Sequence, residues 1–334
     1  MKALVGNEDA KAAFFAAASG SNIPHAWLFA GPQGLGKAAF AQEAAARLLA
    51  HAADPAVPLD VGLPAGDVAA IRQVAAGSHP DFRLLRRLPK DPEKPDQNVA
   101  RSIPIAQIRA LQPMFATKPT YSDRRVVVID SIDDCERAAA NALLKNLEEP
   151  PAGTIFLLIS HAPGRLLPTI RSRCRLLRFS PLEDGTVAGI LRAELPEASD
   201  EEIAVLVRAC QGAPGRALAF AGLDMSAIEH DLRTIASEGD RTNAIRVRMS
   251  SALGTKSAQA RYEAFLRRVP SFIAERARSE KGGRLLNVLD AHRAARDLAA
   301  TALRLSLDPQ ATVFEMGGIV ARLSPSDNNG LPHR

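Results

Sequence analysis

Cysteine is scarce in this sequence, and its placement excludes one class of fold. The 334 residues include three cysteines, Cys135, Cys174 and Cys210, and no two of them are spaced CxxC. Small domains that depend on disulfides are dense in cysteine, so a disulfide framework is excluded. We expect a protein of a reducing compartment, the cytoplasm.

Long apolar runs are also missing. The N-terminal stretch MKALVGNEDA lacks the apolar core of a secretory signal. Elsewhere no uninterrupted apolar run approaches the roughly 20 residues that a membrane-spanning helix needs. We expect a soluble protein with no membrane partner.

Aromatic residues and lysines are few. Aromatics make up 4% of the chain, which argues against a stacking surface for single-stranded nucleic acid. The formal net charge is +5, and 33 of the 42 basic residues are arginine, so charge alone predicts no nucleic-acid footprint. By contrast, a hydrophobic content of 46% is enough to bury a sizeable core, which excludes a largely disordered chain.

Short apolar runs alternate with helical patterns in the first half of the chain. The runs are Ala26–Ala30, Phe82–Leu85, Val126–Ile129, Ile155–Ile159 and Arg175–Phe179. Fully apolar strands separated by helices are typical of a parallel sheet that is covered on both faces.

Beyond about Pro181 the pattern is helical. We therefore predict an α/β fold followed by an all-α region. The predicted divisions are an α/β domain at 1–181, a small helical domain at 182–225, a helical C-terminal domain at 226–324 and a flexible tail at 325–334.

The pattern GxxxxGK lies directly after the first predicted strand. It consists of Gly31, Pro32, Gln33, Gly34, Leu35, Gly36 and Lys37. The glycines let the backbone curl so that N–H groups face an anion, and the lysine reaches the outer phosphates of a nucleotide. Its place between a strand and a helix predicts a phosphate-binding loop, so ATP is the candidate cofactor.

Two positions depart from a hydrolytic site. Ala38 stands where a serine or threonine would ligate Mg²⁺. A second buried strand ends in Asp130, and Ser131 follows where a carboxylate base is expected. We interpret Asp133 and Asp134 as N-caps of the next helix. The sequence predicts little or no ATP hydrolysis and leaves open both a weakened nucleotide site and an empty loop.

Further motifs resemble a known family. They are AAANALLKNLEEPP at 138–151, LLPTIRSRC at 166–174 and SHPDF at 78–82. Together they resemble the clamp-loader branch of the AAA+ ATPases over residues 1–220. This resemblance implies a AAA+ parallel-sheet P-loop domain, a small helical lid domain and a helical C-terminal collar domain.

Within this branch, the chain is most similar to the delta-prime subunits of bacterial DNA polymerase III. The SRC motif of the branch is present as Ser172, Arg173 and Cys174, while Ala38 and Ser131 replace catalytic groups. The ATP-hydrolysing gamma/tau subunit would keep both catalytic groups, and the delta subunit generally lacks the SRC motif. The resemblance therefore implies a subunit whose own ATPase activity is absent or weak.

In the resembling family, the SRC arginine reaches across a subunit interface to the γ-phosphate of ATP bound to the neighbour. The resemblance thus implies that Arg173, flanked by Ser172 and Cys174, is an arginine finger acting in trans. A guanidinium suits this role because it stays charged and can donate two parallel hydrogen bonds to a phosphate. The alternative is that Arg173 belongs to a solvated basic stretch at 165–178.

The resemblance assigns two sensor positions and bears on metal binding. Ser160 ends a predicted strand at the first-sensor position, where a strand-end cap is the alternative, and Arg216 stands where the family has the sensor arginine of the lid.

Many relatives carry a four-cysteine zinc module at the stretch that corresponds to Ala50–Gly77, which contains no cysteine. We therefore predict no zinc and no other bound metal.

The predicted function follows from these motifs. The chain would be a delta-prime-like subunit that helps to load the sliding clamp onto primed DNA. Its partners would be the gamma/tau and delta subunits, with the clamp and primer–template DNA contacted through the assembled complex. The alternatives are an ATP-hydrolysing gamma/tau-type subunit and a nucleotide-dependent DNA-binding switch that acts alone.

Overall fold

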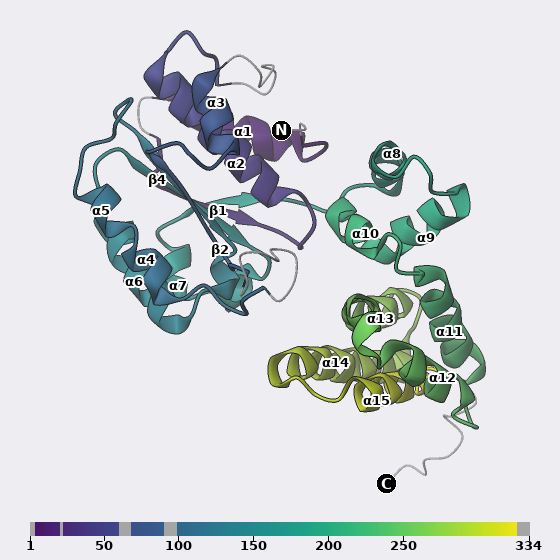
Figure 1. Cartoon of the computed structure of the whole chain (residues 1–334). Coiled ribbons are helices and arrows are strands. Elements are labelled where there is room, and N and C mark those ends of the chain that lie inside the picture. The colour runs from purple at the N-terminus through teal and green to yellow at the C-terminus, as the bar shows by residue number, and fades with distance from the viewer. Residues whose placement is uncertain (1–3, 21–22, 60–67, 90–98, 326–334) are drawn as a thin grey trace. The chain divides into compact units, whose positions relative to one another are not determined.

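The computed structural model describes residues 4–20, 23–59, 68–89 and 99–325, and the chain divides into two compact units (Figure 1). The first unit comprises residues 1–182 and the second residues 183–334. Within the described ranges, every strand belongs to the first unit, and the second unit is helical. The predicted α/β region followed by an all-α region is confirmed.

A single sheet forms the centre of the first unit. Its strands are β1 (Ala26–Ala30), β2 (Phe82–Arg86), β3 (Arg125–Asp130), β4 (Thr154–Ser160) and β5 (Arg175–Arg178). All pair in parallel in the order β2-β3-β4-β1-β5. Each strand agrees with a predicted apolar run to within one residue at either end. Because the strands are parallel, β1, β3 and β4 all end at the same edge of the sheet, where α/β proteins bind ligands.

A cluster of aromatic residues covers one face of this sheet. Trp27 and Phe29 of β1 share a face because side chains alternate along a strand. Phe14 of α1 (Glu8–Ala18) lies 4.8 Å from the Trp27 ring, between centroids, and Phe40 of α2 (Lys37–Ala53) lies 5.4 Å from Phe29. Aromatic pairs at these distances stabilise a core beyond the area that they bury.

The opposite face packs against a second group of helices, of which α7 directly precedes the SRC motif. The remaining helices of the unit are α3 (Ala69–Ala75), α4 (Ile105–Arg109), α5 (Gln112–Phe115), α6 (Arg137–Glu148) and α7 (Pro168–Arg171). Helices α1 to α3 lie on one side of the sheet and α4 to α7 on the other (Figure 1). Leu28 of β1 shares a buried cluster with Leu143 of α6 and Ile170 of α7. Burial of each such side chain contributes about 1.5–3 kcal/mol, which fixes α7 next to the sheet.

The SHPDF motif serves the fold. Asp81 is buried, and its carboxylate accepts hydrogen bonds from the backbone N–H groups of Thr120 and Tyr121. Its own N–H donates to Nδ1 of His79. These bonds satisfy a buried carboxylate and join the start of β2 to the segment that leads into β3.

Eight helices make up the described part of the second unit. They are α8 (Asp184–Glu194), α9 (Asp200–Cys210), α10 (Pro214–Phe220), α11 (Met225–Glu238), α12 (Ala244–Leu253), α13 (Gln259–Ala277), α14 (Gly282–Leu305) and α15 (Pro309–Ala321). Helix α9 begins with a capping box, in which Ser199 and Glu202 bond to each other's backbone N–H groups. Short 3₁₀ turns lie at Ile132–Asp134, Pro163–Arg165 and Lys256–Ala258.

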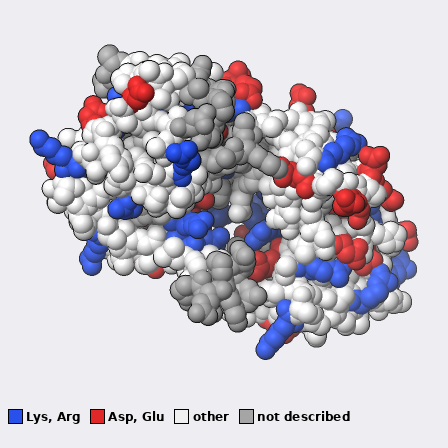
Figure 2. Space-filling view, turned by 45° about the horizontal axis from the view of Figure 1, so that its top comes forward, with Lys and Arg blue, Asp and Glu red and all other residues white. Residues whose placement is uncertain are grey.

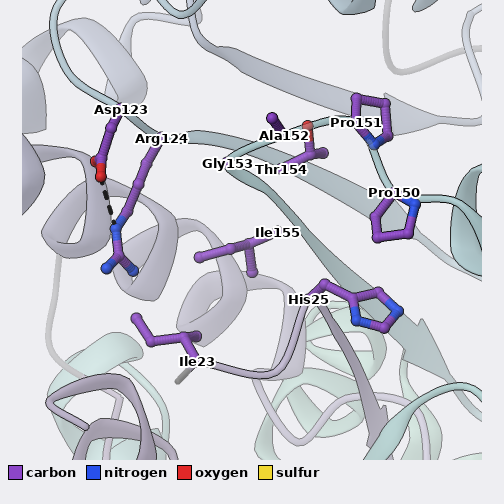
Figure 3. Close-up of a pocket in the computed structure, with 10 residues that line it drawn as sticks. All are labelled: Ile23, His25, Asp123, Arg124, Pro150, Pro151, Ala152, Gly153, Thr154 and Ile155. Carbon is purple, nitrogen blue, oxygen red and sulfur yellow. Dashed lines mark ion pairs between the residues drawn. The ribbon is translucent and has the colours of Figure 1, made fainter. Parts of the chain in front are cut away.

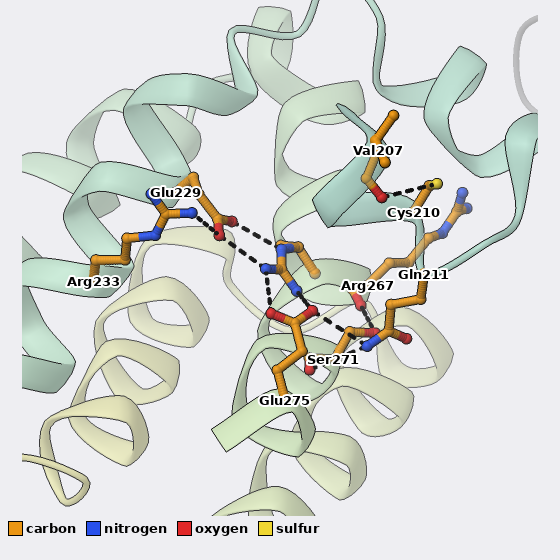
Figure 4. A network of polar contacts seen from close by, with 9 residues as sticks. Val207, Cys210, Gln211, Glu229, Arg233, Arg267, Ser271 and Glu275 are labelled. Atoms are coloured by element: carbon orange, nitrogen blue, oxygen red, sulfur yellow. Dashed lines mark hydrogen bonds and ion pairs between the residues drawn. The ribbon is translucent and has the colours of Figure 1, made fainter. Parts of the chain in front are cut away.

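A network of polar contacts that includes Gln211, Glu229 and Glu275 joins three helices of the second unit (Figure 4). Arg268 of α13 is fully buried and pairs with Glu229 of α11 at 2.9 Å and with Glu275 at 2.8 Å. Gln211, at the C-terminal end of α9, donates to the Glu275 carboxylate and to the carbonyl of Ser271. Removing one partner of a buried ion pair costs about 3–5 kcal/mol, so this network holds α9, α11 and α13 together.

The surface charge matches the mild excess of the composition. On the face shown in Figure 2, acidic and basic side chains are interspersed over the helical unit. Among the described helices, none is both long enough and apolar enough to cross a bilayer.

Some sequence-based predictions fall beyond the described residues. The sequence also predicts loops at 52–66, which is rich in Pro, Asp and Gly, and at 88–98. Residues 60–66 and 90–98 of these loops and residues 326–334 of the predicted tail lie outside the described ranges. The alanine-rich stretch at 37–50 predicts a helix, and α2 continues beyond it to Ala53.

Candidate functional site

The phosphate loop leaves β1 at the edge where β3 and β4 also end. It needs glycine at both of its ends. Gly31 has φ +155°, and a Cβ there would lie 2.3 Å from the Phe179 carbonyl oxygen. Gly36 has φ +78°, and a Cβ there would lie 2.2 Å from Leu4 Cδ1. Helix α2 begins at Lys37, so the free N–H groups of its first turn lie next to the loop.

The other predicted loop residues differ in exposure. Pro32 and Gln33 are exposed, Gly34 is half-buried and Leu35 is buried. Ala38 is half-buried in the first turn of α2, where its methyl group cannot ligate a metal.

Lys37 is directed into its own loop. Its Nζ donates to the carbonyls of Gly31 and Pro32 at 2.6 Å each, and the residue is 2% exposed. Burial lowers the pKa of Lys37 to about 8, although the charges of Asp130 and Asp133 oppose the shift. Two of the three ammonium donors are therefore satisfied by the protein.

The carboxylates after β3 lie close to Lys37. Asp130 ends the strand, and burial together with the charge of Asp134 raises its pKa, which Lys37 partly offsets. Ser131 follows and is buried, and it offers a hydroxyl where a carboxylate base would stand. The structure thus places Asp130 close enough to Lys37 for each charge to shift the other's pKa.

The N-capping prediction for Asp133 and Asp134 is wrong. Helix α6 has Glu136 at its N-cap position, with no side-chain cap. Asp133 instead accepts hydrogen bonds from Ser160 Oγ at 3.0 Å and from the backbone N–H of His161 at 2.5 Å. Asp134 pairs with Arg87 at 3.2 Å. The two carboxylates lie in a 3₁₀ turn, Ile132–Asp134, where tertiary partners replace helix capping.

Ser160 and His161 complete this edge of the sheet. Ser160 is fully buried at the end of β4, and its hydroxyl both donates to Asp133 and accepts from the N–H of Ala162. Burial and the nearby Lys37 charge lower the pKa of His161 to about 4, while Asp133 and a bond to the Gly31 backbone oppose the shift. The sequence-based predictions did not include His161, although its place directly after Ser160 could have signalled it.

The SRC motif lies between α7 and β5. Ser172 Oγ donates to the carbonyl of Thr169 at 3.2 Å, which satisfies an end of the short helix. Cys174 packs against the buried cluster beneath α7, and burial raises the pKa of its thiol to about 12. A thiol with such a pKa stays protonated and is a weak nucleophile, so Ser172 and Cys174 anchor the loop on either side of Arg173.

Arg173 lies at the surface between these anchors. Its side chain is 32% exposed and pairs through Nη2 with Glu148 Oε1 at 2.6 Å. Its Nη1 donates to the carbonyl of Thr169 and, at 3.4 Å, to Ser172 Oγ. Among the described residues these partners lie outside the phosphate loop, so the structure does not bring Arg173 to Lys37 of the same chain.

Arg216 belongs to the second unit, in α10. Burial lowers its pKa, and so do the charges of Arg267 and Arg268, while Cys210 opposes the shift. The structure therefore places a half-buried arginine among two other arginines at the predicted sensor position.

A separate cavity lies at the opposite edge of the sheet (Figure 3). It has a volume of about 340 Å³ and is lined by residues that include His25, Arg124, Pro150 and Thr154. His25 precedes β1 and Thr154 begins β4, whereas the phosphate loop follows the C-terminal end of β1. This cavity is thus distinct from the candidate nucleotide site.

No three His, Cys, Asp or Glu side chains in the part of the chain that the structure describes are arranged to hold a metal ion. Residues 60–67 of the stretch that corresponds to the zinc module lie outside that part. The predicted absence of zinc stays a prediction.

Comparison with known proteins identifies the family of the first unit. The family described as "DNA polymerase III, delta subunit" matches residues 6–183. The chain is 38% identical to DNA polymerase III subunit delta′ of Pseudomonas aeruginosa over 192 residues, which are 57% of this chain and 53% of that protein. It is 37% identical to subunit delta′ of Escherichia coli over 145 residues, 43% of this chain and 40% of that protein.

More distant likenesses extend to other subunits. Subunit tau of Bacillus subtilis is 28% identical over 201 residues, 59% of this chain and 32% of that protein. A solved gamma subunit-related protein from Thermotoga maritima is 18% identical over 89% of this chain and 95% of its own, at a TM-score of 0.41, which is too low to add to the assignment. The matched segments cover about half or less of the curated relatives' own lengths. The family match spans more than half of this chain, so the chain belongs to the DNA polymerase III delta subunit family, and its relatives at 37–38% identity are delta-prime subunits.

Proposed function

We propose that this chain is the delta-prime subunit of a DNA polymerase III clamp loader, which helps to load the sliding clamp onto primed DNA in the cytoplasm. In this proposal Arg173 acts in trans, as an arginine finger on ATP bound to a neighbouring gamma/tau-type subunit. The chain itself hydrolyses little or no ATP. The delta subunit is a further partner, and the clamp and primer–template DNA are contacted through the assembled complex.

The placement of Arg173 is the observation that carries this proposal. The guanidinium is partly exposed on a loop that is anchored on both sides, by the Ser172 hydroxyl and the buried Cys174. Such an anchored loop presents a charge at a fixed place on the surface. Because its contacts lie outside the phosphate loop of its own chain, the phosphate that it serves belongs to another subunit.

The surface around the SRC loop has the character of a protein contact. A cavity of about 510 Å³ is lined by Leu28, Pro163, Pro168 and Leu176, among others. Leu176, on the edge strand β5, is 44% exposed. Apolar surface that is rimmed by arginines is typical of subunit interfaces.

Weak nucleotide use by this chain is supported by the phosphate loop. Lys37 donates to two carbonyls of its own loop, Ala38 offers no metal ligand, and Ser131 offers no carboxylate base. We propose that ATP binds weakly if at all, with Asp130, Ser160 and Arg216 as the residues that would meet it. We also propose that α8 to α10 form the lid and α11 to α15 the collar, which joins a ring with related subunits.

The test replaces Arg173 with alanine in a loader reconstituted from the cognate subunits. An arginine finger contributes on the order of 10³–10⁵ in rate at the site that it serves. We therefore expect most of the DNA-stimulated ATPase activity of the complex to be lost, while assembly by gel filtration is unchanged. Arg192 of α8, which forms a surface ion pair with Asp200 at 3.0 Å in the second unit, is the matched control, and Arg192→Ala should keep the activity.

Unchanged turnover in the Arg173→Ala complex would overturn the proposal. ATP hydrolysis by the isolated chain that is lost on Lys37→Ala would instead favour a gamma/tau-type ATPase. Strong, salt-sensitive DNA binding by the isolated chain would favour a DNA-binding switch that acts alone.

A further inference from the structure

The guanidinium of Arg173 is engaged by its own chain. Nη2 forms the ion pair with Glu148 at 2.6 Å, and Nη1 donates to the Thr169 carbonyl at 2.9 Å and to Ser172 Oγ at 3.4 Å. An arginine has five N–H donors, so these contacts take three of them and involve both terminal nitrogens.

Contact with a phosphate needs these same donors. A bidentate contact uses two parallel N–H groups, and the terminal nitrogens reach furthest from the backbone. To point both of them at a neighbour, Arg173 must leave the Glu148 carboxylate. We propose that Glu148 is a positioning residue that holds Arg173 in a stowed conformation until the polyphosphate of a neighbouring subunit displaces it. This inference rests on the proposed function of Arg173.

Glu148 and Thr169, which both bind Arg173, belong to helices that pack against the sheet. Glu148 is the last residue of α6, whose Leu143 and Leu147 belong to the buried cluster under the sheet. Thr169 lies in α7, which Ile170 anchors in the same cluster. The stowed position is therefore set by rigid helices, and only the Arg173 side chain has to move.

The position of Glu148 strengthens the pairing. A carboxylate at a helix C-terminus lies near the negative end of the helix dipole, so the guanidinium neutralises an otherwise unfavourable charge. Ion pairs at the surface are nevertheless weak, and Arg173 and Glu148 are 32% and 49% exposed. We expect this pair to bias the finger by up to about fivefold, which a triphosphate of higher charge can overcome.

The test measures ATP hydrolysis by the reconstituted complex without DNA or clamp. Glu148→Ala should raise this basal turnover by up to about fivefold, with the KM for ATP unchanged, because the extended finger becomes more populated. Glu148→Gln, which keeps an acceptor but no charge, should give a smaller rise. Glu149→Ala, at the adjacent exposed carboxylate, is the matched control and should leave the rate as in the wild type.

The double variant separates this inference from the proposed function. Glu148→Ala combined with Arg173→Ala should return the rate to that of Arg173→Ala alone, because Glu148 acts only through the finger. If Arg173→Ala lowers turnover but Glu148→Ala leaves it unchanged or lowers it, the stowed conformation is wrong and the finger stands. If Arg173→Ala itself has no effect, the proposed function fails.

Discussion

Lys37 and Arg173 are both predicted to face phosphates, Lys37 in its own loop and Arg173 in trans, and their surroundings differ. Lys37 is almost fully buried, donates to two carbonyls of its own loop and has a pKa lowered to about 8 by burial. Arg173 is 32% exposed and pairs with a carboxylate that is itself half exposed. A buried charge with satisfied donors is costly to redirect, whereas a surface pair exchanges partners at little cost. The contrast suits a chain that offers a cation to a neighbour and makes little use of its own loop.

The largest expected effect is the difference in ATP turnover between a complex with Arg173→Ala and a complex with Lys37→Ala. In the reconstituted complex, Arg173→Ala should remove on the order of 10³ in rate at the site that it serves. Lys37→Ala should change DNA-stimulated turnover by less than about twofold, because we propose that this chain's own site does not drive the reaction. Assays of both variants in the same preparation measure the gap. Equal losses would break the comparison and favour a gamma/tau-type subunit.

A second expected effect is a loss of folding stability at acid pH, caused by His161, which lies near Lys37. The pKa of His161 is about 4 in the fold, below its ordinary value of 6.5. Between these values the unfolded chain binds more protons, so stability is complete above about pH 6.5 and falls as the pH drops toward 4. This residue alone accounts for up to about 3 kcal/mol of that loss.

Trp27 makes the acid effect measurable. It is the single tryptophan and is fully buried in β1, so its fluorescence follows unfolding of the first unit. Denaturant titrations at pH 6.5 and pH 4.5 should show a smaller loss of stability for His161→Asn than for the wild type. Some slope should stay, because burial also lowers the pKa of His79. An equal loss of stability between the two pH values in both proteins would show that His161 is hydrated and that water reaches this edge of the sheet.

The smallest expected effect is a difference in the free energy of unfolding between two carboxylate substitutions, one at Asp133 near Lys37 and one at Glu148 beside Arg173. Asp133→Asn weakens charge-assisted bonds to Ser160 and to the His161 N–H, and should lower the free energy of unfolding by about 1–2 kcal/mol. Glu148→Gln weakens a surface ion pair and should cost less than about 1 kcal/mol. Trp27 fluorescence during denaturant unfolding measures both. A larger loss of stability for Glu148→Gln than for Asp133→Asn would contradict the view that the surroundings of Lys37 are rigid and that the Arg173 ion pair exchanges easily.

Much of the first unit could be predicted from local patterns. The five apolar runs predicted β1 to β5 to within one residue because fully apolar strands bounded by turns suit a parallel sheet. The phosphate loop was located by its glycines and by Lys37, since the positive φ angles of Gly31 and Gly36 disfavour any other residue there. The stretch 136–147, which ends shortly before Pro150 and Pro151, has a helical pattern, and the structure forms α6 there with its bounds displaced by one residue.

The predictions that failed or were missing depend on distant partners. Asp133 precedes a helix and carries a good capping side chain, yet it bonds to Ser160 and His161 across the sheet edge. No local pattern reports that β3 and β4 end side by side, because strand order is a property of the whole sheet. The lowered pKa of His161 was invisible for the same reason.

Local sequence was enough to predict the strands, the phosphate loop with Ala38 and Ser131 at two of its expected catalytic positions, and the SRC motif, because each depends on residue types at short spacing. How Lys37 and Arg173 are held depends instead on tertiary packing. Lys37 turns into its own loop because the sheet edge buries it beside Asp130 and Asp133. Arg173 meets Glu148 because two helices distant in sequence pack on one face of the sheet. Burial and long-range pairing follow from packing, which local sequence does not encode.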